Sequence, residues 1–127
     1  MQIRAIAAAD APKALGGYAQ AIEASGAQRL LFISGQVPAE PDGAVPPGFE
    51  AQARLAWRNV ERQLAAAGMG LDNLLKCTTY LARREDGLAA RKVRLEVLGD
   101  RQLALTTIVA GIFDEAWLLE IEAIAAA

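Results

Sequence analysis

Two polar side chains stand inside otherwise apolar segments near opposite ends of the 127-residue chain. Ser34 follows four apolar residues and precedes Gly35, and Glu120 follows Leu118-Leu119. Burying a polar group costs free energy unless it finds a partner, so each is either a structural hydrogen-bonding group or part of a site. We therefore take Ser34 and Glu120 as candidate site residues, and interpret Glu122, on the same face of its strand as Glu120, as a solvated acid.

The chain contains no histidine and only one cysteine, Cys77. Without histidine it has no Ser-His or Cys-His nucleophile pair and no imidazole ligand for a metal. A single cysteine forms no intramolecular disulfide and no Cys-x-x-Cys pair. Because Cys77 lies within a predicted strand, we interpret it as a small buried hydrophobic residue. Any chemistry must use carboxylates, hydroxyls, backbone amides and water, so no cofactor and no metal is expected.

Length and composition limit the class of protein. The hydrophobic fraction of 54% is high, largely through alanine, and the net charge is −2. Basic residues at 83–84 and 91–94 are interleaved with acids and are interpreted as a solvated helix face, so no nucleic-acid partner is expected. No apolar run reaches the about 20 residues that cross a bilayer, and the N-terminus lacks a signal-peptide pattern. We expect one domain, residues 1–127, in the cytoplasm without a membrane partner.

Apolar spacing predicts the elements that must position these side chains. Positions 49–67 repeat apolar residues every three to four residues and end at Gly68, which predicts a helix. A second helix is predicted over 84–98, with Leu88, Leu95 and Leu98 as its anchors and Gly99 at its end. Strands are predicted at 3–6, 18–24, 29–36, 74–81, 105–110 and 117–125.

This order of elements favours an α+β sandwich with both helices on one face of a mostly antiparallel sheet. The first three strands are expected to form an antiparallel meander, and the continuous apolar run at 29–36 is typical of a strand covered on both sides. The sheet face without helices still carries apolar groups, which would leave an exposed patch on a monomer. We therefore expect an oligomer.

Three segments together resemble the RidA/YjgF (reactive intermediate deaminase A) family, over about residues 11–125. They are Gly16-Gly17-Tyr18, the segment from Phe32 to Pro38 and the segment from Leu118 to Ala125. The resemblance implies a chorismate-mutase-like fold, assembled as a homotrimer with small-molecule sites in the clefts between subunits. It maps Glu120 onto a glutamate that positions an attacking water and Ser34 onto a hydroxyl in the cleft. It also places Tyr18, Gly35, Leu105 and Thr107 at the substrate.

The chain departs from that family at one position. Leu105 stands where the family's deaminases carry an arginine that grips the substrate carboxylate, and Leu103 replaces a companion proline. Leucine cannot form this two-pronged charged contact, whose loss would lower the rate by orders of magnitude. Arg101 is therefore added as a candidate substrate-binding residue, with Arg91 or Lys92 as other sources of positive charge. A non-standard substrate is expected.

Three functions follow from this pattern. The first is hydrolytic deamination of an enamine or imine metabolite, with water held by Glu120 and Ser34 near the developing charge. The alternative is a non-catalytic trimer that binds a small metabolite in a regulatory role. The family's older label, ribonuclease or translation inhibitor, is less attractive because an acidic chain without histidine offers neither a basic groove nor the usual proton carrier.

Overall fold

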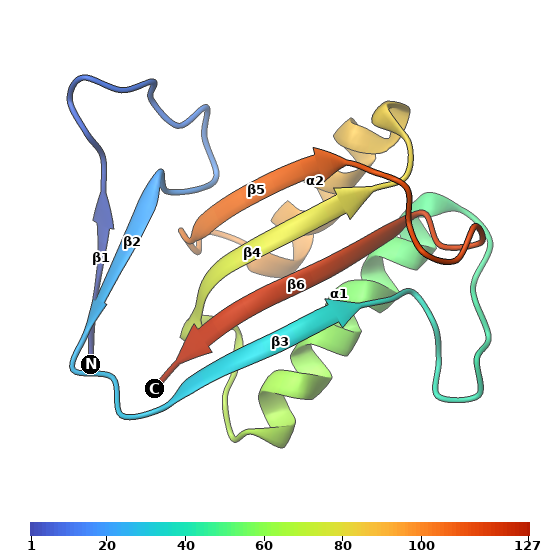
Figure 1. Cartoon of the computed structure of the whole chain (residues 1–127), viewed down its shortest axis with the longest axis horizontal. Coiled ribbons are helices and arrows are strands. Elements are labelled where there is room, and N and C mark those ends of the chain that lie inside the picture. Colours follow the sequence, from blue (N-terminus) through green and yellow to red (C-terminus); the bar gives the residue numbers. More distant parts are fainter.

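The chain forms a four-stranded sheet, a separate two-stranded hairpin and two helices that cover the same face of the larger sheet (Figure 1). The computed structural model describes all 127 residues. In chain order the elements are β1 (Gln2–Ile6), β2 (Ala21–Ser25), β3 (Leu30–Gln36), α1 (Phe49–Ala66), the short 3-10 turn η1 (Leu71–Asn73), β4 (Leu74–Leu81), a second 3-10 turn η2 (Arg84–Asp86), α2 (Gly87–Leu98), β5 (Ala104–Val109) and β6 (Leu119–Ala126). The predicted α+β class and the order of strands and helices are confirmed.

Helix α1 packs its apolar stripe against the sheet, as its three-to-four-residue spacing predicts. Trp57, Val60 and Leu64 on this stripe are buried. The Gly68 N–H donates to the Ala65 carbonyl, and Gly68 has a φ of 70°, a left-handed conformation that glycine adopts without strain. The helix therefore ends where the sequence places its C-terminal cap.

Helix α2 differs from its prediction in start and in anchors. Residues 84–86 form the 3-10 turn η2, so the α-helix begins only at Gly87. The predicted anchors Leu88 and Leu95 are wrong, because their exposed fractions are 84% and 41%, whereas Val93 and Leu98 are buried. Leu88 and Leu95 are two helical turns apart and therefore share one stripe, and this stripe points away from the core that Val93 and Leu98 enter.

The larger sheet has the order β3-β6-β4-β5 and is mixed. Strand β6 lies antiparallel between β3 and β4, and β5 runs parallel to β4 through the α2 crossover. Leu119 and Ile121 of β6 are buried beneath the helices, and Glu120 and Glu122 lie on the opposite face, as alternation predicts. We call the face without helices the open face.

The expected meander of the first three strands is wrong. Strand β2 pairs only with β1, and β3 pairs with β6 instead. Between β2 and β3 the N–H groups of Gln28 and Arg29 both donate to the Ala127 carbonyl, which holds the start of β3 beside the end of β6. The predicted strand at 18–24 begins only at Ala21. Partner choice between distant strands depends on tertiary contacts, so the local pattern could not decide it.

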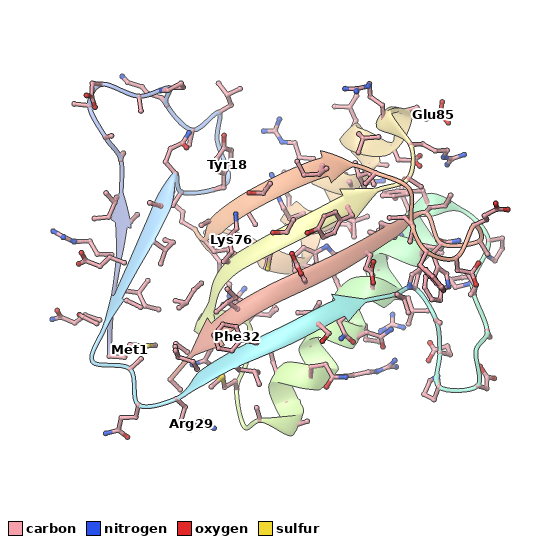
Figure 2. The ribbon with its side chains drawn as sticks, viewed as in Figure 1. Met1, Tyr18, Arg29, Phe32, Lys76 and Glu85 are labelled. Atoms are coloured by element: carbon pink, nitrogen blue, oxygen red, sulfur yellow. The ribbon has the colours of Figure 1, made fainter.

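Strand β3 is covered on one side only in the single chain, contrary to expectation. Ile33 is buried beneath α1, but Phe32 is 70% exposed and Leu30 is 61% exposed. Figure 2 shows Phe32 on β3, on the side of the sheet turned toward the viewer. A fully apolar strand pattern is typical of two covered faces, and this chain by itself covers only one of them.

Candidate functional site

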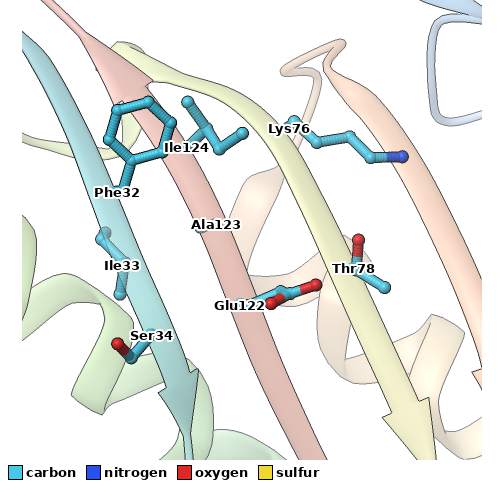
Figure 3. A pocket seen from close by; sticks show the side chains of 8 residues that line it. All are labelled: Phe32, Ile33, Ser34, Lys76, Thr78, Glu122, Ala123 and Ile124. Carbon is cyan, nitrogen blue, oxygen red and sulfur yellow. The ribbon is translucent and has the colours of Figure 1, made fainter.

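The open face carries a pocket of about 440 Å³ across β3, β6 and β4 (Figure 3). One end of this pocket is apolar, where Phe32 of β3 lies beside Ile124 of β6. The other end is polar. The lining residues are Phe32, Ile33, Ser34, Lys76, Thr78, Glu122, Ala123 and Ile124.

Ser34 and Glu122 come together at the polar end of this pocket. Ile33 pairs with Ala123 in the antiparallel register, so the next residues, Ser34 and Glu122, are neighbours across β3 and β6. The Ser34 side chain is exposed and is available to a ligand. Both residues line the same pocket, although in Figure 3 the Ser34 hydroxyl points away from β6 and the Glu122 carboxylate points toward β4.

Glu122 is held in place by Tyr80 of β4. The Tyr80 hydroxyl donates to Oε1 of Glu122 over 2.7 Å. This hydrogen bond, with burial and the negative charges of both glutamates, raises the pKa of Tyr80 above its usual value. Sequence reasoning missed Tyr80, although the alternation of Lys76, Thr78 and Tyr80 in a predicted strand already placed three polar groups on one face.

Lys76 is the one cation in the open-face pocket. Its ammonium group donates to Oγ1 of Thr106 over 2.5 Å, across to the neighbouring strand β5. In Figure 3 the side chain extends away from Glu122 toward β5. The lysine thus contributes positive charge to the rim of the pocket but pairs with no carboxylate there.

Glu120 lies farther along β6 and packs directly over Gly35. A Cβ atom built on Gly35 would overlap the Glu120 carboxyl group and lie 2.8 Å from its Cγ. The register between β3 and β6 shifts between Ile33 and Gln36, and this bulge brings the glycine beneath the acid. Ser34, Gly35 and Glu120 are therefore neighbours on the open face.

Leu105 and Thr107 lie on the other face of the sheet. They pair with Cys77 and Thr79 of β4, and Leu105 packs against the core beneath the helices. In a single chain the sheet separates them from Ser34 and Glu120. The predicted site residues therefore form two groups that cannot contact the same small molecule within one protomer.

Tyr18 belongs with the second group. Figure 2 shows Tyr18 in the loop before β2, near the beginning of β5. The next residue, Ala19, donates its N–H to the Leu103 carbonyl over 2.9 Å, which attaches the loop to that edge of the sheet. The Tyr18 hydroxyl accepts a hydrogen bond from the Leu15 N–H over 3.4 Å. The tyrosine is thus placed by its loop beside β5.

Two of the suggested cations are already paired. Nε of Arg101 donates to Oδ1 of Asp72 over 2.7 Å, and Nζ of Lys92 donates to Oε1 of Glu50 over 3.0 Å. Neither lines the open-face pocket or the cavity beside Thr107. The structure therefore places Arg101 at a surface ion pair instead of beside the other candidate residues.

Cys77 is fully buried between the sheet and the helices, and burial raises the pKa of its thiol to about 12. A thiol that stays protonated is a poor nucleophile. No three side chains of His, Cys, Asp or Glu gather in a group that could hold a metal ion. Neither helix is long and apolar enough to span a bilayer.

The fold and the open-face residues define a class of small α+β proteins with two helices on one side of a mixed sheet. The family model described as Endoribonuclease L-PSP matches residues 8–127. The chain belongs to this family, which is the RidA/YjgF family.

Individual relatives agree with this assignment. The chain is 36% identical to "RutC family protein PH0854" of Pyrococcus horikoshii over 118 residues, and these residues make up 91% of each chain. It is 30% identical over 98 residues to "Putative reactive intermediate deaminase TdcF" of Escherichia coli K12, covering 76% of this chain and 74% of that one.

Solved structures extend the likeness to the whole chain. The crystal structure of E. coli TdcF with bound serine matches with a TM-score of 0.72 and 28% identity over 98% of each chain. The Rid-family protein YyfB of Yersinia pestis matches over the full length of both chains with a TM-score of 0.84. Its identity is 23%, so this second likeness concerns the fold alone.

Proposed function

We propose that the protein hydrolyses the C–N bond of a small enamine or imine metabolite. The observation that carries the proposal is the close packing of Glu120 over Gly35 beside the exposed Ser34 hydroxyl. A carboxylate and a hydroxyl on one sheet face, next to a pocket of about 440 Å³, suit general acid-base chemistry on a small molecule. The deaminase name and the bound serine of the relative TdcF support a substrate related to amino compounds.

In this mechanism the imine reacts in its form protonated on nitrogen, and Glu120 accepts a proton from a water as the water oxygen attacks the imine carbon. The resulting carbinolamine carries a hydroxyl group and an amine on that carbon. Glu120 gives its proton to the amine nitrogen, the C–N bond breaks with loss of ammonia, and the hydroxyl proton passes back to Glu120 as the carbonyl forms. An enamine is first protonated on carbon to the imine. The Ser34 hydroxyl serves as a hydrogen-bonding group for the oxygen or the nitrogen on the reacting carbon, where charge develops.

The catalytic unit in this proposal is a homotrimer with its sites between subunits. Two groups of candidate residues lie on opposite faces of one sheet, so a complete site needs Ser34 and Glu120 from one protomer and Tyr18 and Thr107 from another. The exposed Phe32 supports burial of the open face against a second copy. No nucleic acid or membrane enters this scheme, and the cytoplasm remains the expected compartment.

The substrate in this proposal differs from the 2-iminoacids of the family's usual deaminases. Leu105 is packed against the core and offers no donor to a carboxylate. The same observation favours a second candidate function, a trimer that binds a small metabolite without turning it over, because the missing guanidinium removes a group that positions the substrate.

Ammonia release from freshly generated imines tests the proposal. We expect a rate above that of buffer, lowered about 100-fold or more in Glu120→Gln because general acid-base catalysis contributes on that order. Glu61→Gln, which removes an exposed unpaired acid from α1, is the matched control and should keep the rate. Ammonia no faster than in buffer, with saturable ligand binding retained, would favour the binding protein instead.

A further inference from the structure

A second cavity, of about 40 Å³, lies between α2 and the helix-side face of β4 and β5. Its polar lining consists of Thr79, Thr107, Arg91 and Arg94, and the rest of its wall is apolar. This volume exceeds the about 10–15 Å³ of accessible cavity space that one water needs. The cavity therefore fits the head group of a ligand, while the remaining atoms of that ligand must lie outside it.

Arg94, which lines this cavity, has a buried Nε–H group without a hydrogen-bond acceptor. Its Nε is buried and has no hydrogen-bond partner, and it is the one buried side-chain nitrogen or oxygen of the chain in that condition. Burial and the neighbouring positive charge of Arg91 lower the pKa of Arg94. The predicted solvated helix face is therefore wrong for Arg94. A buried unpaired charged donor is costly, and an anion would remove that cost.

Most other cations of the chain already have an acidic partner. Ion pairs occupy Arg4, Arg54, Arg58, Arg62, Arg83, Lys92 and Arg101. Arg91 and Arg94 have no carboxylate within 4.0 Å, although they lie close enough to each other for their charges to interact. Two guanidinium groups without a counter-charge at one small cavity are suited to an anionic ligand.

The Gly16-Gly17 loop lies over these two arginines. A Cβ atom on Gly17 would lie 3.5 Å from Nη2 of Arg94, and one on Gly16 would lie 3.9 Å from Nη2 of Arg91. Gly17 has a φ of 74° and Gly16 a φ of 99°, so both use a backbone conformation that favours glycine. The loop brings Tyr18 near Arg94 as well, because the tyrosine influences the titration of that arginine.

We propose that Arg91 and Arg94 form an anion site that takes the carboxylate of a small organic acid. A planar carboxylate matches the donor fork of a guanidinium and the small volume of the cavity. One part of this inference rests on the proposed hydrolysis, namely that the ligand is the substrate. In that case the substrate carries an acidic group, and residues of α2 bind this group in place of a residue at position 105. The substrate would then differ from the family's usual substrates in the position of its carboxylate, and it would still be an anion.

A binding titration with propionate tests the site, with propionamide as a neutral probe of similar size. We expect propionate, and not propionamide, to shift the NMR signals of the Arg94 Nε–H and the Gly17 amide in a saturable way at constant ionic strength. Arg94→Gln should weaken propionate binding about tenfold or more, as expected for a lost charge-assisted hydrogen bond. Arg84→Gln removes an exposed, unpaired arginine outside the cavity and should leave the affinity unchanged.

Saturable shifts absent from these two signals, or equal binding of both probes, would overturn the proposal. So would an Arg94→Gln protein that binds propionate as well as Arg84→Gln does. If Arg94→Gln does not fold, Arg94→Lys and Arg91→Gln make the same test, because a lysine keeps the charge but loses the planar fork.

The test separates this site from the hydrolytic activity. Propionate binding that depends on Arg94, in a protein that releases no ammonia from any imine, would support the anion site and remove the proposed function. Conversely, hydrolysis that proceeds equally on carboxylate-bearing and neutral imines, and is unchanged in Arg94→Gln, would leave the function standing and remove the anion site.

Discussion

The carboxyl group of Glu120 lies against the backbone of Gly35, in space that a Cβ atom would otherwise occupy. The bulge between β3 and β6 creates this contact by shifting the register after Ile33. The absence of a side chain at Gly35 of β3 therefore decides where the Glu120 carboxylate of β6 can lie.

Gly35→Ala should displace Glu120 and destabilise the protein. An added methyl in occupied space costs about 1–3 kcal/mol, which should appear as a lower denaturant midpoint. Gly111→Ala is the control, because a Cβ there meets nothing within 4 Å and the φ of Gly111 is not positive. It should change stability by less than about 0.5 kcal/mol. Equal midpoints for the two variants would show that Glu120 moves aside freely.

Glu122→Gln should lower the pKa of Tyr80 toward its usual value of 10.0, because the hydrogen bond to Glu122 is the largest cause of the present elevation. Absorbance titration of phenolate in a Tyr18→Phe background measures it, since Tyr18 is the other tyrosine. A folded-state pKa above the unfolded one adds stability below pH of about 10 that is lost as pH rises further. Glu61→Gln should leave the titration unchanged, and an unmoved pKa in Glu122→Gln would contradict the assigned cause.

Cys77 should resist thiol reagents in the folded protein at pH 8. Its thiol is buried and has a pKa of about 12, so both access and thiolate fraction are low. Labelling with a chromogenic disulfide should be slow in buffer and rapid in guanidinium chloride. Fast labelling of the folded protein would indicate that the interface between β4 and the helices opens frequently.

Arg94→Leu should raise the free energy of unfolding by about 1 kcal/mol, because it removes a buried donor without a partner. Denaturant unfolding in the absence of organic anions measures this change. Arg84→Leu, at an exposed position, should have little effect. A large loss of stability in Arg94→Leu would mean that an acid from another subunit pairs with this arginine in the assembly.

Light scattering should give the mass of three chains, and Phe32→Asp should reduce it toward that of one chain. The 70% exposed Phe32 lies on the open face, where the proposed contact between copies would bury it. Phe113→Asp places the same charge at another exposed phenylalanine, in the turn before β6, and should leave the mass unchanged. A wild-type mass equal to one chain would be incompatible with sites between subunits.

Local patterns were sufficient to predict most elements. Strand β4 has the predicted bounds, and helix α1 begins at the predicted residue and ends one residue early. Period-two alternation also placed Glu120 and Glu122 on the face opposite Leu119. These features depend on residues a few positions apart, whose geometry is set by the backbone repeat itself.

The sequence alone determined the family's signature residues, the two helices and the absence of histidine chemistry. Only the tertiary structure decided that β3 pairs with β6, that Gly35 lies beneath Glu120, that Leu105 and Thr107 face away from Ser34, and that Arg94 is buried without a partner. Each of these depends on segments far apart in the chain. Their contacts arise from the competition among strand partners and from packing, and neither leaves a local periodic pattern.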